Sequence, residues 1–382
     1  MDDDRLWEPL ENDGAGRETI YRVERTFAGD VWSRFWRRPT AIFGLVLILL
    51  LIIFALTGPL FSPYRYGDQN LSFVNIPPYF NAYVYGERYF YVTQNLKLVE
   101  LDGQGRLLAS VKTIRDDGAR KLTLFDTGGG ELGIDYSRRP PVLVDDRGPL
   151  EEMKFFWNKT YFLGTDNLGR DLLTRLMFGA RISLVVAFVA AFVNLVIGII
   201  FGGISGLIGG LPDLVMMRIV DIIATIPLTL YVILIMVFLN SGFLSIIIAL
   251  SSVYWVNMAR IVRGQILALK EQEFVLAART IGTSNGDILM RHLIPNAIGP
   301  IIVTATMLIP SAIFVEAFMS FIGLGVSAPM ASWGTMCNDA IETFRVSPYQ
   351  LFFPSLAICA AMFAFNFVGD GLRDALDLKK DM

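Results

Sequence analysis

Long stretches without a charged residue constrain this chain more than any other feature of its sequence. A helix needs about 20 apolar residues, at about 1.5 Å each, to cross the ~30 Å hydrocarbon core of a bilayer. No Asp, Glu, Lys or Arg occurs in five tracts, which are Thr40–Pro63, Ile182–Pro212, Ile222–Ala259, Leu293–Val315 and Val346–Gly369. A large soluble core could hold one such tract. Five in 382 residues predict a polytopic α-helical membrane protein.

The tract Ile222–Ala259 is long enough for two spans, and its Asn240-Ser241-Gly242 triplet is a turn signal between them. The total is then six transmembrane helices. We interpret residues 40–62 as the first of them. The apolar run begins some 39 residues into the chain and lacks a small-residue cleavage pattern, which argues against a signal peptide.

Lys and Arg in the short loops predict the orientation, because such loops stay in the cytoplasm when they are basic. The segment Arg260–Arg291 contains five basic residues, and the loop around Asn240 contains none. A basic cluster also precedes the first span, and Arg373, Lys379 and Lys380 follow the last. These signals agree on a cytoplasmic N-terminus, C-terminus and fourth-to-fifth connection.

Residues 63–162 then lie on the extracytoplasmic side of the membrane. Short runs rich in β-formers alternate there with Gly- and Asp-containing turns, as in Tyr83–Tyr85, Tyr89–Val92, Leu107–Ile114 and Lys121–Phe125. This alternation of short strands and turns predicts a β-rich, mainly antiparallel extracytoplasmic insert between helices 1 and 2. The charged and apolar residues of Asp166–Arg181 predict an interfacial helix leading into span two, or alternatively a surface helix of the insert.

Residues 1–39 form a predicted cytoplasmic arm, in which Arg22–Trp36 has the pattern of an amphipathic helix on the inner membrane face, with Trp32, Phe35 and Trp36 as anchors. Residues 372–382 form a cytoplasmic tail. In the second span, small residues recur at Gly198, Gly202 and Gly206. This spacing predicts close helix packing, either within the chain or against another subunit.

The motifs of several enzyme classes are absent from the sequence. No Lys follows a Gly, so there is no P-loop, and G-x-S-x-G, H-E-x-x-H and C-x-x-C are missing as well. With one His and two Cys, no multi-His or four-Cys metal centre is possible. The net charge of −3 gives no footprint for nucleic acid. We expect no catalytic and no metal site, so any uphill transport draws its energy from another protein.

The most informative segment is the cytoplasmic loop, residues 264–296. Glu273–Thr280 predicts a short helix with favourable end charges, and Gly282 is placed to terminate it. Ser284 to Asp287 resembles a capping box that opens a second helix. The small residues Ala277 and Ala278 would let another protein surface approach closely. An ordinary loop helix that packs on its own neighbours explains the pattern equally well.

The residues of this loop match a family signature: Glu273, Ala277, Ala278 and Gly282, followed by His292, Leu293, Pro295 and Asn296. The chain resembles the second, C-type permease of dipeptide and oligopeptide ABC importers. Three further stretches carry the resemblance, which are Leu163–Leu184, Glu316–Gly325 and Gly369–Asp377. It covers residues 30–64 and 160–378. The insert at 66–159 is longer than the usual external loop of such permeases.

The resemblance implies a type I ABC importer permease fold, with residues 163–371 as the permease core, in a bacterial or archaeal inner membrane. It also implies a second homologous permease, two cytoplasmic ATPases that bind ATP and Mg²⁺, and an extracytoplasmic substrate-binding protein. This chain itself would be neither an enzyme nor a cofactor binder. The 273–282 helix would sit in a cleft of one ATPase and transmit its movement to the spans.

Two acidic residues, Asp221 and Glu316, lie at or within the apolar spans. For Asp221 we expect an ion pair with Arg218, three residues earlier on the helix. Glu316 either lines an external gate or makes a structural pair, and for His292 we expect a structural hydrogen bond. Peptides are the expected cargo. The alternatives are a nickel chelate or another solute, an ATP-independent secondary transporter, and a membrane receptor whose insert does the work.

Overall fold

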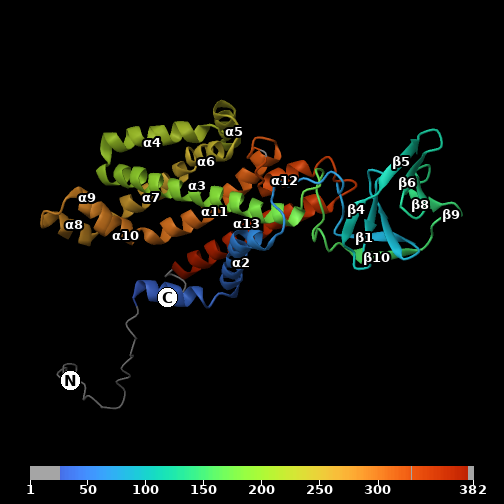
Figure 1. Cartoon of the computed structure of the whole chain (residues 1–382). Helices are drawn as coiled ribbons and strands as arrows, with labels where there is room; N and C mark the ends of the chain where they lie inside the picture. The colour runs from blue at the N-terminus through green and yellow to red at the C-terminus, as the bar shows by residue number, and fades with distance from the viewer. Residues whose placement is uncertain (1–25, 328, 377–382) are drawn as a thin grey trace, which may run out of the picture.

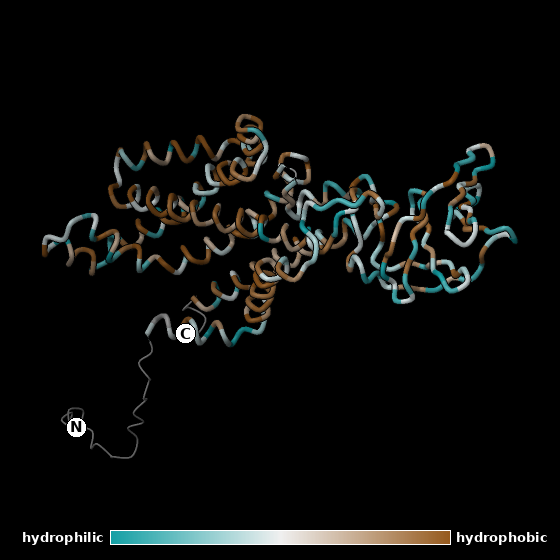
Figure 2. The backbone as a smooth tube through the Cα atoms, viewed as in Figure 1, coloured by the Kyte–Doolittle hydropathy of each residue, from teal (hydrophilic) through white to brown (hydrophobic). Residues whose placement is uncertain are grey.

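The structure is a computed structural model that describes residues 26–327 and 329–376. Its helices form one part of an elongated molecule and its strands the other part, at the opposite end (Figure 1). Hydropathy follows the same division, because the helices are mostly hydrophobic, whereas the strand region and the tip that carries α8 and α9 contain the hydrophilic segments (Figure 2). The apolar tracts and the predicted β-rich insert are therefore also separated in space.

Among the described residues, five helices are long and apolar enough to cross a membrane. They are α2 (Pro39–Phe61), α3 (Leu172–Ile208), the run of α6 (Phe243–Ser251) and α7 (Trp255–Leu269), α11 (Ile298–Phe321) and α13 (Tyr349–Leu376). A further pair, α4 (Gly210–Thr225) and α5 (Leu228–Leu239), passes the same test only together and is bent by 85°. The number of spans is five, or six if this pair is one span.

The glycines of α3 pack against α7, which answers the question of their partner. A Cβ atom on Gly202 would lie 2.3 Å from the carbonyl oxygen of Ala259, and one on Gly198 would lie 2.4 Å from the Met258 side chain. Neither distance is compatible with a side chain. The predicted close packing is confirmed, and its partner belongs to the same chain.

The helix predicted over Asp166–Arg181 does not exist as a separate element. Asp171 caps α3, accepting a hydrogen bond from the Thr174 amide at 2.8 Å, and α3 then continues without a break for 37 residues. The residues before it form a turn whose charged side chains are buried. The prediction of an interfacial helix is wrong, because these charges pair with one another inside the protein instead of facing lipid headgroups.

Helix α2 contains Pro59, which has no N–H group and so frees the carbonyl of Ala55, four residues earlier. Arg181 of α3 supplies the missing donor, with Nε 2.5 Å from the Ala55 oxygen and Nη2 2.8 Å from the Leu56 oxygen. Just beyond the end of α2, the hydroxyl groups of Ser62 and Thr174 lie 2.5 Å apart. The segment between α2 and α3 therefore leaves and re-enters the helical part at one place.

Ten strands in two antiparallel sheets lie between α2 and α3. One sheet has the order β10-β1-β2-β3-β4 and the other runs consecutively from β5 to β9. Their bounds are β1 Tyr79–Tyr85, β2 Arg88–Val92, β3 Leu98–Leu101, β4 Leu107–Ser110, β5 Lys112–Asp117, β6 Leu122–Asp126, β7 Glu131–Asp135, β8 Val142–Asp145, β9 Gly148–Pro149 and β10 Met153–Trp157.

One core joins the two sheets, since Phe90 and Leu98 of the first cluster with Phe125 and Leu132 of the second. The run Leu107–Ile114, which the sequence presents as one strand, is divided between β4 and β5 at Val111. Val111 packs against the shared core, so the chain crosses from one sheet to the other there.

The strand region is hydrogen-bonded to the start of α13. Tyr349 donates to the carbonyl oxygens of Ile76 and Thr165, at 3.0 and 2.9 Å. The side-chain amide of Gln350 donates to the Asn75 side chain and to the Thr165 carbonyl, both at 2.9 Å. These buried bonds hold the first and last parts of the inserted segment to the helices.

The remaining helices are short and lie near the ends of the long ones. They are α1 (Phe27–Phe35), α8 (Glu273–Thr280), α9 (Asn285–Asp287), α10 (Ile294–Asn296) and α12 (Trp333–Asp339). In α1, Trp32 is exposed, whereas Phe35 is buried against Ala41 and Ala375. Phe35 is thus not the predicted membrane anchor. The predictions for residues 1–25 and 377–382 fall outside the described residues.

Candidate functional site

Helix α8 has the bounds that the sequence predicts, Glu273–Thr280. It ends at Gly282, whose φ of 87° is a left-handed conformation that glycine adopts without strain. The Thr283 amide donates to the Ala278 carbonyl at 3.1 Å, which closes the last turn. The predicted role of Gly282 in terminating the helix is confirmed.

The second helical segment of the loop begins as predicted, since the Ser284 hydroxyl accepts a hydrogen bond from the Asp287 amide at 3.2 Å. It continues as a π-helix over Ile288–Leu293, which contains His292, and then as α10, which contains Pro295. The sequence did not predict the π-helix. The Asn296 side chain donates to the His292 carbonyl at 2.6 Å, whereas the role of the imidazole stays a prediction.

The two faces of α8 differ in what they contact. Val275 and Ala278 are buried in a core with Ile288 and Leu293 of the π-helix. Phe274, Ala277 and Ile281, spaced three and four residues apart, are exposed, and such residues share one face of a helix. We call these three residues the outer face of α8. The two alanines of the signature therefore point in different directions.

Three ion pairs join α4 to α7 or lie within α4. Asp221 lies 3.7 Å from Arg218, as the spacing predicts, and also 2.9 Å from Arg260 of α7. Asp213 forms a two-pronged pair with Arg263, with both N–O distances 2.6 Å. The Asp213–Arg263 pair was not predicted, because its two residues are 50 positions apart in the sequence.

Glu316 of α11 is fully buried. Its carboxylate accepts hydrogen bonds from Ser183 of α3 and Ser320, each at 2.8 Å. Ser320 in turn contacts the Ser332 hydroxyl at 3.2 Å, and Ser332 caps α12. No ion pair of Glu316 occurs within residues 26–327 and 329–376. The Glu316 carboxylate thus connects α11, α3 and α12 through the hydroxyl groups of three serines.

A second buried charge cluster lies where α3 begins. Asp166 contacts the guanidinium groups of Arg170 and Arg175 at 2.6 and 2.5 Å, and Asp339 at the end of α12 contacts both at 3.1 and 2.9 Å. Nearby, burial raises the pKa of the Asp171 carboxyl, against the effect of its hydrogen bonds from Thr174. The cluster contains two aspartates and two arginines, so its formal net charge is zero.

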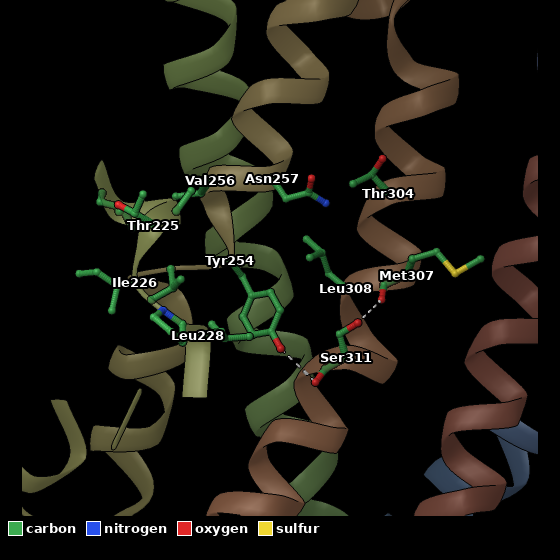
Figure 3. Close-up of a pocket in the computed structure, with 14 residues that line it drawn as sticks. Thr225, Ile226, Leu228, Tyr254, Val256, Asn257, Thr304, Met307, Leu308 and Ser311 are labelled. Carbon is green, nitrogen blue, oxygen red and sulfur yellow. Dashed lines mark hydrogen bonds between the residues drawn. The ribbon is translucent and has the colours of Figure 1, made fainter. Parts of the chain in front are cut away.

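A pocket of about 480 Å³ lies among α4, α5, α7 and α11 (Figure 3). Two interruptions of helices meet at it, one at Ile226-Pro227 between α4 and α5 and one at Ser252–Tyr254 between α6 and α7. Tyr254 donates across it to the Ser311 carbonyl at 3.2 Å. The fourteen lining residues include no charged side chain, and the polar ones are Thr225, Tyr254, Asn257, Thr304 and Ser311.

Sequence reasoning did not identify this pocket. Pro and small polar residues inside an apolar tract mark places where a helix can break. The sequence contains two such signals, at Thr225-Ile-Pro227 and at Ser251-Ser252. Nothing in the sequence indicated that the two breaks come together. That juxtaposition depends on how α4, α7 and α11 pack together.

The comparisons with known sequences identify the family of the chain. Residues 195–381 match the family described as the binding-protein-dependent transport system inner membrane component, and residues 26–78 match the N-terminal transmembrane domain of oligopeptide transport permease C. The chain belongs to this family of ABC-transporter permeases.

Individual relatives are similar over nearly the whole chain. The oligopeptide transport system permease protein OppC of Bacillus subtilis is 38% identical over 98% of this chain and 97% of its own length. The dipeptide permease DppC of the same organism is 35% identical over 95% and 89%. Among solved structures, the inward-facing MetNI methionine ABC transporter matches 53% of this chain and 96% of its own, with 18% identity and a TM-score of 0.44.

Proposed function

We propose that the chain is one of two membrane-spanning permease subunits of an ATP-driven peptide importer. The names of its relatives, which refer to oligopeptide and dipeptide transport, support peptides as the cargo. The chain forms half of the translocation pathway. A second homologous permease supplies the other half, two cytoplasmic ATPases bind ATP and Mg²⁺, and an extracytoplasmic binding protein delivers the substrate.

In this proposal the bent pair α4 and α5 counts as one span, which gives six. Both chain ends and the loop with α8 face the cytoplasm of a bacterial or archaeal inner membrane, and the two sheets lie outside. The five basic residues of Arg260–Arg291 support this orientation. Trp32 and Trp36, both exposed at α1, suit the headgroup region on the cytoplasmic side.

The observation that carries the coupling role is the division of α8 into two faces. Its outer face is apolar although it is exposed, and Ile281 is 83% accessible. Its inner face is anchored by Val275 and Ala278. An ATPase that binds the outer face therefore moves the core beneath it, which continues through the π-helix and Pro295 into α11. Glu273 starts the helix and is exposed to the same partner.

Glu316 is proposed to shape the external gate. It connects α11, α3 and the capped start of α12, so a change in the relative position of these helices has to break its hydrogen bonds. Replacement by Gln keeps the size of the side chain but removes the carboxylate. Unchanged peptide uptake and unchanged ATPase coupling in the Glu316→Gln importer would refute this role.

The importer proposal is tested by purifying the chain with its neighbouring gene products and reconstituting the complex in vesicles with the binding protein. We expect ATPases to co-purify and labelled tripeptide to enter only with ATP, without displacement by a nickel chelate. Ile281→Asp should lose the ATPases, whereas Ile114→Asp, at an exposed isoleucine of β5, should keep them. A chain that never retains an ATPase would overturn the proposal.

A further inference from the structure

The pocket shown in Figure 3 is separate from the coupling helix α8, which contributes no residue to its lining. Broken helices at membrane depth expose backbone polar groups, and these are tolerated only where protein buries them or where they line a water-filled cavity. Two breaks, at Ile226-Pro227 and at Ser252–Tyr254, border this pocket. Interrupted helices are also where transporters of other folds bind their substrates. Protein burial and a water-filled cavity both exclude lipid, and the exposed side chain of Asn257 in the lining favours the water-filled cavity.

The chemistry of the wall is that of hydrogen bonding without charge. Asn257 is exposed on α7, and its amide offers both a donor and an acceptor. Thr304 faces the same space from α11, as Figure 3 shows. Thr225, Tyr254 and Ser311 are the other polar residues of the lining. Its apolar part includes Met307, whose flexible side chain adapts to different shapes. Asp221 and Arg260 lie about one helical turn from the lining residues Thr225 and Asn257, and they pair with each other at 2.9 Å.

We propose that this pocket binds the backbone of the transported peptide, with Asn257 and Thr304 as the groups that contact its amides. Each peptide unit carries one N–H donor and one C=O acceptor, which an amide side chain matches whatever the residue side chains are. A volume of about 480 Å³ suits a short peptide segment. Because the wall is uncharged, acidic and basic peptides pass equally well. This inference rests on the proposed function, since it assumes peptide as cargo.

The test places a charge in the wall. Asn257→Asp keeps the shape of the side chain and adds one negative charge, so uptake of an acidic tripeptide should fall about tenfold relative to a lysine-containing one. Asn95→Asp makes the same change at an exposed turn of the strand region and should leave the ratio at the wild-type value. The assay uses the complete importer in vesicles, with the same binding protein throughout. An unchanged peptide preference of Asn257→Asp would overturn the inference.

A second measurement does not depend on transport. Cys337 and Cys359 are replaced by Ser, and a single cysteine is introduced at Asn257 or, as control, at the exposed Leu234 of α5. A membrane-impermeant maleimide should label position 257 in the assembled complex, more slowly when tripeptide is present, and should not label position 234. A position 257 that stays unlabelled would overturn the inference. Loss of ATP-driven uptake in the wild-type complex would instead refute the importer proposal and leave the labelling result to decide about the pocket.

Discussion

At the scale of single residues, a very close contact between α3 and α7 depends on a missing side chain. Gly202 of α3 lies against the backbone of Ala259, and Gly264 of α7 has no neighbour within 4 Å of an added Cβ. We expect Gly202→Ala to destabilise the protein by about 1–3 kcal/mol, because the two helices must move apart. Gly264→Ala makes the same chemical change in open space and should be neutral or slightly stabilising. Thermal unfolding of the purified complex compares them, and equal midpoints would contradict the packing.

The buried charges at the start of α3 depend on one another in a similar way. Asp166 contacts two guanidinium groups that are almost completely buried. Removing one member of a buried cluster leaves a charge without its partner, so Asp166→Asn should cost about 3–5 kcal/mol. The matched change Asp117→Asn weakens a long pair at 3.9 Å with the exposed Arg120, and the amide oxygen can still accept from the Ala119 and Arg120 amides, so it should cost about 0–1 kcal/mol. The difference should be visible as a lower unfolding temperature of the first variant, and its absence would show that the cluster is not needed.

At the scale of elements, the two alanines of α8 should respond differently to the same substitution. Ala277→Trp enlarges the exposed outer face, so the permease should keep its unfolding temperature but lose its ATPases. Ala278→Trp forces a large ring into the core with Ile288 and Leu293, so the unfolding temperature itself should fall. Co-purification and thermal unfolding are measured on both variants. Identical behaviour of the two would contradict the assignment of the faces.

The bounds of α8 were predictable because their signals are local. Gly282 is needed for a left-handed φ, and Ser284 accepts from an amide three residues later. Such contacts depend on a few neighbouring residues and leave a readable pattern. The same holds for the strands, although Leu107–Ile114 shows that a pattern does not reveal which sheet a residue joins.

The features that sequence reasoning missed depend on contacts between distant residues. Asp166 and Arg175 look like the polar side of a surface helix until Asp339, 164 residues later, is placed beside Arg175. Asn257 and Thr304 form one wall only because α7 and α11 are neighbours. The spacing of Asp213 and Arg263 likewise contains no local signal. One sequence cannot report these pairs, since each member has an ordinary explanation on its own element.

At the scale of the whole molecule, the position of the sheets depends on a few buried hydrogen bonds from α13. Gln350→Leu removes the bonds to Asn75 and Thr165, so the Asn75 side-chain oxygen loses this donor, whereas the Thr165 carbonyl keeps only its bond from Tyr349. We expect about tenfold faster amide exchange at Asn75, Ile76 and Thr165, because an unpaired buried polar group costs about 1–3 kcal/mol. Gln104→Leu, at an exposed turn, is the matched control. Hydrogen exchange followed by mass spectrometry measures both, and equal rates would contradict the dependence on α13.

The 2.5 Å contact between Ser62 and Thr174 has a consequence for how this gene can change. The entry and exit of the inserted segment are adjacent, so a short linker could replace the strands, provided that it keeps Asp166, Arg170 and Asp171, which belong to the buried charge cluster or cap α3. The two sheets can therefore vary separately from the helices. Selection can lengthen, replace or delete the strands while the membrane-spanning helices keep their arrangement.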